Sequence, residues 1–314
     1  MSIVCFGELL IDFIANESGV TVGQASGFEK AAGGAPANVA VGIQRLGFEA
    51  SFMGQVGDDP FGHYLASVLQ AEGVNIEGLV FSEAARTTLA FVSLQADGER
   101  SFVFYRHPGA DMLMPVEAIA YKQLDQAQIF HYGSITLIHD ISRRTTLAAR
   151  DYASEQGAFI SYDPNLRLAL WESEAAARQG ILAGLDKVNL LKISDEELEF
   201  LCGEEGIDSL WRDSLEYILL THGAAGASLY TRDGHYQVAG YPVKAIDTTG
   251  AGDSFVAAIL SGILQNRNQL DAKFADIIAY ANAVGALTTQ KRGAIPALPT
   301  RAEVEQFLST QARD

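Results

Sequence analysis

Apolar residues in the second half of the chain come in short continuous runs, with longer amphipathic stretches between them. The runs are AQIFHYG (127–133), AFISYD (158–163), VNLLKIS (188–194) and EYILLTHG (216–223). Helical patterns follow near 140–156 and 171–185 and in DEELEFL (195–201). Continuous Ile, Leu, Val and Phe runs separated by such helices indicate a parallel sheet covered on both faces. Ligands of such folds bind at the carboxyl ends of the strands.

A different pattern occurs in TLAFVSLQADGERSFVFYR (88–106), where polar and apolar residues alternate. The alternation surrounds Asp97-Gly98, a dipeptide favoured in tight β-hairpins, and it indicates antiparallel strands. The stretch 11–31 is also strand-like and rich in loops. We predict that 11–31 and 88–111 form a small β-sheet lid over an α/β domain made of 1–10, 32–87 and 112–314. The Phe and Val side chains on its exposed face predict a homodimer formed through the lid sheet.

Composition narrows the possible partners. The 314 residues are 48% hydrophobic and carry a formal net charge of −17, spread along the sequence. This charge argues against nucleic acid or anionic membranes as partners, but one local cluster of Arg and amides would suffice for an anionic substrate. Cys5 and Cys202 lie far apart in apolar contexts, which favours two buried thiols in a reducing compartment. The N-terminus lacks a basic signal region and no apolar run approaches the roughly 18 residues of a membrane helix, so we expect a cytoplasmic protein.

The segment AAGGAPANVAVGIQRLG (31–47) predicts a helix that begins beside a ligand. Pro36 suits the first turn of this helix and Gly47 suits its end. Gly33 and Gly34 let the backbone approach a ligand closely, and Asn38 offers both a donor and an acceptor. Taken alone, the segment is equally compatible with a glycine-containing turn before a helix.

The segment DTTGAGDSF (247–255) precedes the apolar run FVAAILSGIL and predicts another helix start. Gly250, Ala251 and Gly252 leave the first N–H groups free to face an anion, and the helix dipole adds to this attraction. Asp253 is either a carboxylate favoured by the dipole or a general base beside an anion hole, as phosphoryl transfer to an alcohol requires. Because the dipole also stabilises the carboxylate, we expect Asp253 to be a weak base.

Other polar segments are less specific. The segment SYDPNLR (161–167) ends a predicted strand with Asp163, Asn165 and Arg167, which fits either phosphate or polyol binding or a structural salt bridge. The chain has no G-x-x-x-x-G-K-[ST] loop, so any nucleotide would be bound without a Walker A lysine. The glycine-rich THGAAGAS (221–228), taken alone, is typical of a turn between strands.

Together these segments resemble the ribokinase, or PfkB, family of carbohydrate kinases. GGAPANVA is similar to the family's N-terminal signature and DTTGAGDSF to its C-terminal one, and the resemblance runs essentially end to end. It implies a ribokinase-like α/β/α sandwich of three layers, with a mainly parallel central sheet and a small β-sheet lid. Several segments resemble the fructokinases of that family: CFGELLIDF, AARTTLAF, FVFYRHPGADMLM, FHYGSITLI, SYDPNLRLALW and RGAIPALPT. They imply ATP-dependent phosphorylation of D-fructose to fructose 6-phosphate, with Mg²⁺ and K⁺ as cofactors.

The resemblance also implies roles for individual residues. Asp253 would be the base, and the N–H groups of Gly250, Ala251, Gly252 and Asp253 would form the anion hole. The residues implied on the sugar side are Asp12, Gly33, Gly34 and Asn38, with Phe104 and Arg106 closing from the lid and Arg167 reaching toward sugar or phosphate. Those implied for the nucleotide are Asn165, Lys192, Thr221, Gly223, Gly226 and Asn282. Those implied for cations are Glu197 for Mg²⁺ through water and phosphate, and Asp247, Thr249 and the backbone near Lys291 and Gly293 for K⁺.

One motif departs from the family pattern, and some alternatives stay open. The N-x-x-E motif that organises Mg²⁺ and its waters is SDEE here (194–197), with Ser194 where the family has Asn; Ser is common there in fructokinase-like members. Ribose, an aminoimidazole riboside and 2-keto-3-deoxygluconate are alternative substrates. For the last, Tyr105 and Arg106 would face a carboxylate. A regulator that binds sugar or nucleotide without turnover is the alternative from a different class.

Overall fold

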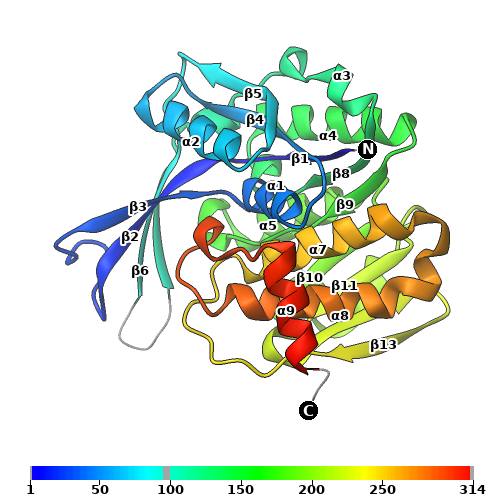
Figure 1. Cartoon of the computed structure of the whole chain (residues 1–314). Helices are drawn as coiled ribbons and strands as arrows, with labels where there is room; N and C mark the ends of the chain where they lie inside the picture. Colours follow the sequence, from blue (N-terminus) through cyan, green and yellow to red (C-terminus); the bar gives the residue numbers. More distant parts are fainter. Residues whose placement is uncertain (1, 95–99, 312–314) are drawn as a thin grey trace.

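A computed structural model describes residues 2–94 and 100–311, which form two β-sheets and the helices around them (Figure 1). The larger sheet has the order β13-β12-β11-β10-β9-β8-β1-β4-β5. Its strands are β1 (Ser2–Phe6), β4 (Ala50–Gly57), β5 (Asn75–Ser82), β8 (Ala127–Tyr132), β9 (Phe159–Tyr162), β10 (Leu190–Ser194), β11 (Tyr217–Thr221), β12 (Gly226–Thr231) and β13 (Gly234–Ala239). Strands β11 through β5 pair in parallel, and β12 and β13 add an antiparallel edge. The predicted parallel sheet is therefore confirmed.

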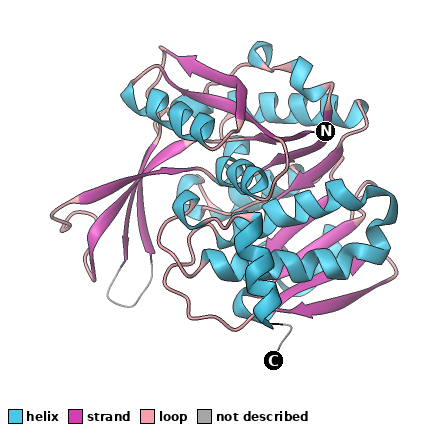
Figure 2. Ribbon diagram, in the orientation of Figure 1, coloured by secondary structure: helices cyan, strands magenta, loops and turns pink. Residues whose placement is uncertain are grey.

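Helices cover both faces of this sheet (Figure 2). They are α1 (Ala35–Arg45), α2 (Pro60–Ala71), α3 (Tyr121–Leu124), α4 (Asp140–Glu155), α5 (Glu174–Ala183), α6 (Asp195–Cys202), α7 (Ala251–Asn266), α8 (Leu270–Thr288) and α9 (Arg301–Gln311). Successive β1 side chains enter different cores: Ile3 packs in the cluster that contains α1, α2, α7 and α8. Val4 packs in the cluster that contains α4, α5 and α6. Side chains of a strand alternate between faces, so the two clusters are the two sides of a three-layer sandwich.

The smaller sheet projects from one side of the sandwich and has the order β3-β2-β6-β7. Its strands are β2 (Leu10–Ser18), β3 (Phe28–Gly33), β6 (Leu89–Leu94) and β7 (Arg100–Tyr105). The predicted antiparallel pairing of β6 with β7 is confirmed, and β2 joins the two halves of the sheet by pairing with β6 in parallel. The turn expected at Asp97-Gly98 lies outside the described residues. The domain boundaries drawn from the sequence remain predictions.

The carboxyl ends of the parallel strands define where a ligand can bind. Glu8 follows β1, Asp163 follows β9, Ser194 ends β10 and Thr221 ends β11. The small sheet joins the sandwich at the same edge, since β2 begins only four residues after β1 ends. These polar residues and the base of the small sheet therefore lie at the same end of the parallel strands.

Cys5 and Cys202 are both free and buried. Within residues 2–94 and 100–311 no helix is long and apolar enough to cross a lipid bilayer.

Candidate active site

Helix α7 begins without a capping side chain. Its N-cap, Gly250, has a left-handed backbone with φ of 78°, which favours glycine, and no side chain of the described residues bonds to this helix start. The N–H of Ala251 donates to the Thr248 carbonyl at 3.3 Å. The N–H groups of Gly252 and Asp253, at the next positions, are thus the best placed to receive an anion, together with the positive end of the helix dipole. The Ala251 amide, which also belongs to the predicted anion hole, would have to release the Thr248 carbonyl before it could bind an anion.

Asp253 lies in the first turn of α7 and is held from the opposite helix. The Asn38 side-chain amide donates to Asp253 Oδ2 at 2.7 Å, although 215 residues separate the two. The helices approach closely because α1 has glycine at the crossing: a Cβ on Gly42 would lie 2.7 Å from the Ala257 Cβ. Asn38 Oδ1 is buried with no hydrogen-bond partner among the described residues. The pair therefore offers two acceptors, the Asp253 carboxylate and Asn38 Oδ1, each of which can accept a hydrogen bond from a hydroxyl group.

The expectation that Asp253 is a weak base is wrong. Burial raises the pKa of Asp253 to about 6, with the Asp163 charge adding to the increase and Asn38, Arg167 and Lys192 opposing it. The expectation considered only the helix dipole, whereas desolvation of the carboxylate by the tertiary packing has the larger effect. A carboxylate with a raised pKa is a better proton acceptor near neutral pH.

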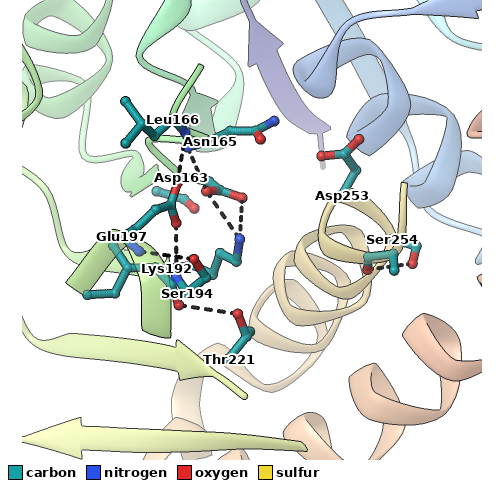
Figure 3. Close-up of polar contacts among 12 residues, drawn as sticks. Asp163, Asn165, Leu166, Lys192, Ser194, Glu197, Thr221, Asp253 and Ser254 are labelled. Atoms are coloured by element: carbon teal, nitrogen blue, oxygen red, sulfur yellow. Dashed lines mark hydrogen bonds and ion pairs between the residues drawn. The ribbon is translucent and has the colours of Figure 1, made fainter. Parts of the chain in front are cut away.

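Lys192 places a positive charge beside the start of α7. The side chain rises from β10, is almost fully buried, and its Nζ lies 3.1 Å from Asp163 Oδ2 (Figure 3). A Cβ on Gly252 would come within 3.5 Å of the same Nζ, so glycine leaves this amine open toward the helix start. Burial alone would lower the pKa of Lys192, but Asp163 and Glu197 raise it above its usual range. The lysine therefore stays charged where an anion would sit.

Glu197 and Asn165 organise the loop after β9. Glu197 Oε1 accepts from the Leu166 N–H at 2.8 Å and Oε2 accepts from the Ser194 N–H at 2.9 Å. Ser194 in turn caps α6 by accepting from the Glu197 N–H, so the SDEE segment is a reciprocal capping box. Asn165 has a positive φ of 46° and its N–H donates to Asp163 Oδ1. Both Glu197 oxygens keep lone pairs for water, which fits an outer-sphere role at a metal.

The lid comes near Arg167 through Phe102, an aromatic residue that the sequence analysis did not single out. The guanidinium of Arg167 lies 6.0 Å from the ring centroid of Phe102, at the limit of a cation–π contact. Phe102 stacks on the predicted Phe104 with ring centroids 5.9 Å apart. Both residues lie on the same face of β7, because they are two positions apart. The spacing itself could have indicated Phe102.

The predicted sugar-side glycines are required by close packing. A Cβ on Gly33 would overlap Asp12 Oδ2, and a Cβ on Gly34, which has a φ of 112°, would lie 2.3 Å from the Glu8 carbonyl oxygen. Asp12 and Phe104 share a face of the lid sheet, because each is in register with Ala90. The structure thus brings together Asp12, Gly33, Gly34 and Asn38 around the start of α1.

Arg106, which is predicted to close over the sugar, is buried at the base of the lid, and its contact with a sugar remains a prediction. Its side chain is only 3% exposed, and Nε lies 2.7 Å from Asp111 Oδ2. Nη2 donates to the Ile135 carbonyl at 3.2 Å. The residue directly follows β7, so its chain has already returned to the sandwich. Arg106 thus anchors the base of the lid in a buried ion pair.

Four of the residues predicted for the nucleotide, Thr221, Gly223, Gly226 and Asn282, lie around strands β11 to β13. Gly223 and Gly226 have positive φ in the turn between β11 and β12, and Thr221 Oγ1 donates to the Ile193 carbonyl. Asn282 Nδ2 donates to the Val238 and Ala239 carbonyls at 3.0 and 3.1 Å, which fixes the end of β13 beside this turn. That Asn282 holds adenine remains a prediction.

Asp247 connects the two loops predicted to hold a monovalent cation. Its Oδ1 accepts from the N–H and Oγ1 of Thr249, and its Oδ2 accepts from the Gly293 N–H at 2.9 Å. Gly293 has a φ of 82°. The carboxylate thus holds two turns of backbone together, where carbonyl oxygens could complete a cation site. No group of three or more His, Cys, Asp or Glu among residues 2–94 and 100–311 could hold a metal by itself.

Glu8 is a second residue of this region that the sequence analysis missed. It is 2% exposed, and burial raises its pKa to about 7. Its position directly after a buried strand is the same signal that indicated Asp163.

Comparison with known proteins gives a consistent result. A model of the pfkB family carbohydrate kinases matches residues 1–301. A fructokinase of Solanum tuberosum is 50% identical over 98% of this chain and 95% of its own length. A crystal structure of a fructokinase from Xylella fastidiosa with bound ATP superimposes with a TM-score of 0.91 at 35% identity, covering 99% of both chains. A Vibrio cholerae fructokinase double mutant with bound fructose, ADP and potassium ion gives 0.88 at 35% identity, covering 98% of both. The expected ribokinase-like fold is confirmed by these likenesses.

Proposed function

Because the chain belongs to the pfkB family of carbohydrate kinases, we propose that it is a fructokinase, which transfers the terminal phosphoryl group of ATP to the 6-hydroxyl of D-fructose. The observation that carries this proposal is the Asp253 carboxylate held by Asn38 at the open start of α7, with Lys192 beside it. Relatives that share this chain's full length are named fructokinases. The site supplies a base, an acceptor for a hydroxyl and positive charge, the three elements that phosphoryl transfer to an alcohol requires.

The proposed reaction is an in-line displacement. Asp253 accepts the proton as the O–H bond of the sugar breaks, and the sugar oxygen forms a bond to the terminal phosphorus. The bond from that phosphorus to the bridging oxygen breaks, and ADP leaves. The N–H groups of Gly252 and Asp253, with Lys192, would stabilise the charge on the transferring group. Asn38 keeps the carboxylate aimed at the hydroxyl, which supplies orientation.

Two cations are proposed from the residues that could hold them. Glu197 would orient waters of a Mg²⁺ bound mainly to phosphate oxygens, because its carboxylate is already fixed by two backbone N–H groups. Asp247 and the backbone of Thr249 and Gly293 would hold K⁺. When bound, such cations neutralise phosphate charge and order the loop before the anion hole.

We also propose a homodimer through the lid and a cytoplasmic location. Val103 and Tyr105 of β7 are 41% and 65% exposed, an apolar surface that a second lid could cover. The two free, buried cysteines fit a reducing compartment.

The pH dependence of turnover follows from the raised pKa of Asp253. The carboxyl group must be ionised to accept a proton, so kcat/KM for fructose should fall tenfold per pH unit below about 6 and level off above it. The measurement is a pH series in mixed buffers at constant ionic strength, with ATP saturating. A profile that stays flat down to pH 4.5 would remove Asp253 from the role of base.

The substrate is tested by a panel of sugars in a coupled assay of ADP release, with and without K⁺. The panel contains fructose, mannose, glucose, ribose and 2-keto-3-deoxygluconate. We expect fructose to give the highest kcat/KM and K⁺ to increase it. A higher value for ribose or the keto acid would identify a different kinase of the family, and ATP binding without turnover of any sugar would indicate a regulator.

A further inference from the structure

The carboxyl group of Glu8 is buried between the sugar side of the site and the base of the lid. Its Oε1 accepts a hydrogen bond from the N–H of Ala35, the first residue of α1, at 2.9 Å. Its Oε2 is buried without a hydrogen-bond partner among the described residues. An unpartnered buried carboxylate oxygen costs free energy, so its presence at this position calls for an explanation.

The backbone around Glu8 packs against the same turn. A Cβ on Gly34 would approach the Glu8 carbonyl oxygen to 2.3 Å, and a Cβ on Gly7 would meet the ring of Pro36 at 2.4 Å. These distances show that the turn at Gly34 packs directly against the backbone of residues 7 and 8. The turn carries Gly33 and, one helical turn later, Asn38, which holds Asp253.

The charges of the ion pair at the base of the lid also act on Glu8. Asp111 and Arg106 are the charged groups that act on it, Asp111 raising its pKa and Arg106 lowering it. Arg106 also donates to the Ile135 carbonyl, and the buried hydroxyls of Ser134 and Thr136 on either side have no partner among the residues described. Burial is the largest effect on the pKa of Glu8 and favours the neutral acid. The neutral acid can donate a hydrogen bond through its O–H, whereas a carboxylate can only accept.

We infer that Glu8 is a positioning residue for the sugar, which holds the turn at Gly34 and the start of α1 in place through its bond to the Ala35 N–H. This inference rests on the proposed function. The sugar would then lose affinity when the Glu8 carboxyl is removed or shortened, while the phosphoryl side of the site, formed by α7 and Lys192, would keep its chemistry.

The test compares three substitutions. Glu8→Ala and Glu8→Asp should raise the fructose KM, and the fructose Kd from calorimetry, at least about tenfold, because the Ala35 N–H loses its buried acceptor. The kcat and the ATP KM should stay within about threefold of the unsubstituted enzyme, an effect of well under 1.4 kcal/mol. Glu8→Gln should restore the fructose KM to within about threefold, because its amide oxygen still accepts and its NH₂ replaces the acid O–H.

The matched control is Asp59→Asn. Asp59 is another buried carboxylate at a helix start, capping α2 through the N–H groups of Phe61 and Gly62. Its substitution should lower thermal stability without a selective effect on the fructose KM.

Several results would overturn the role of Glu8. They are an unchanged fructose KM in both Glu8→Ala and Glu8→Asp, equal losses in every kinetic parameter, or Glu8→Gln behaving like Glu8→Asp. If Glu8→Ala does not fold, the comparison of Asp with Gln still decides. Failure of the unsubstituted enzyme to phosphorylate fructose would instead contradict the proposed function itself.

Discussion

Replacing Asp253 by asparagine should lower kcat by a factor on the order of 10²–10⁴, the range expected when a general base is removed. The substitution keeps the shape of the side chain and an oxygen for the Asn38 amide, which now lies 2.7 Å from Asp253 Oδ2. It removes only the ability to take a proton. Because Lys192 and the amides of α7 remain, the Kd for ATP should stay within about threefold, which corresponds to less than 1 kcal/mol. Steady-state kinetics and calorimetry with ATP measure the two effects.

The control for this variant is Asp271→Asn. Asp271 is also an aspartate in the first turn of a helix, α8, where it accepts from the Tyr217 hydroxyl at 2.6 Å. Its loss should affect stability rather than turnover. An Asp253→Asn enzyme with more than about a tenth of the original kcat would be inconsistent with general-base catalysis.

Replacing Arg106 by alanine should lower the free energy of unfolding by about 3–5 kcal/mol, because breaking a buried ion pair leaves Asp111 charged and unpaired. The two side chains are 3% and 1% exposed, and Asp111 also accepts from the Thr88 hydroxyl at 2.5 Å. The lid base would lose its anchor, so sugar binding should weaken as a consequence of this structural loss. Urea unfolding followed by circular dichroism measures the change in stability.

A double variant separates burial of a lone charge from other causes. Arg106→Met combined with Asp111→Leu removes both charges together and should recover most of the lost stability. Arg301→Ala at the exposed Arg301–Glu305 pair, with side chains 54% and 60% exposed, should change stability little. If the free energy of unfolding of Arg106→Ala lies within about 1 kcal/mol of that of the parent protein, the buried pair has no anchoring role.

The parts of the larger sheet that could be predicted are those buried on both faces. Strands β8 to β11 have continuous apolar runs because helices cover both of their faces. The apolar run at 127–133, for example, corresponds to strand β8, Ala127–Tyr132. Strand β13, GHYQVA, is exposed along nearly its whole length and carries no such signal. The parallel pairing of β2 with β6 joins segments far apart in the sequence, so no local pattern specifies it.

The site was predictable where a local pattern carries the chemistry. The GAGD segment indicates an open helix start by itself, since small residues and an acid in the first turn are a local property. The base strength of Asp253 was not predictable, because it depends on burial by distant elements. The burial of Arg106 and its ion pair with Asp111 were not predictable, because both depend on the folded chain. Glu8, in contrast, follows a buried strand as Asp163 does, so a local signal could have indicated it.

The most direct measurement is a crystal structure with fructose and a non-hydrolysable ATP analogue. We predict that the terminal phosphate accepts hydrogen bonds from the N–H groups of Gly252 and Asp253, at about 3 Å, and that Lys192 Nζ donates to the same oxygen atoms. We also predict that one sugar hydroxyl lies within hydrogen-bond distance of both the Asp253 carboxylate and the Asn38 side-chain amide. A terminal phosphate bound away from the start of α7, or a sugar whose hydroxyls do not reach Asp253, would contradict the proposed mechanism.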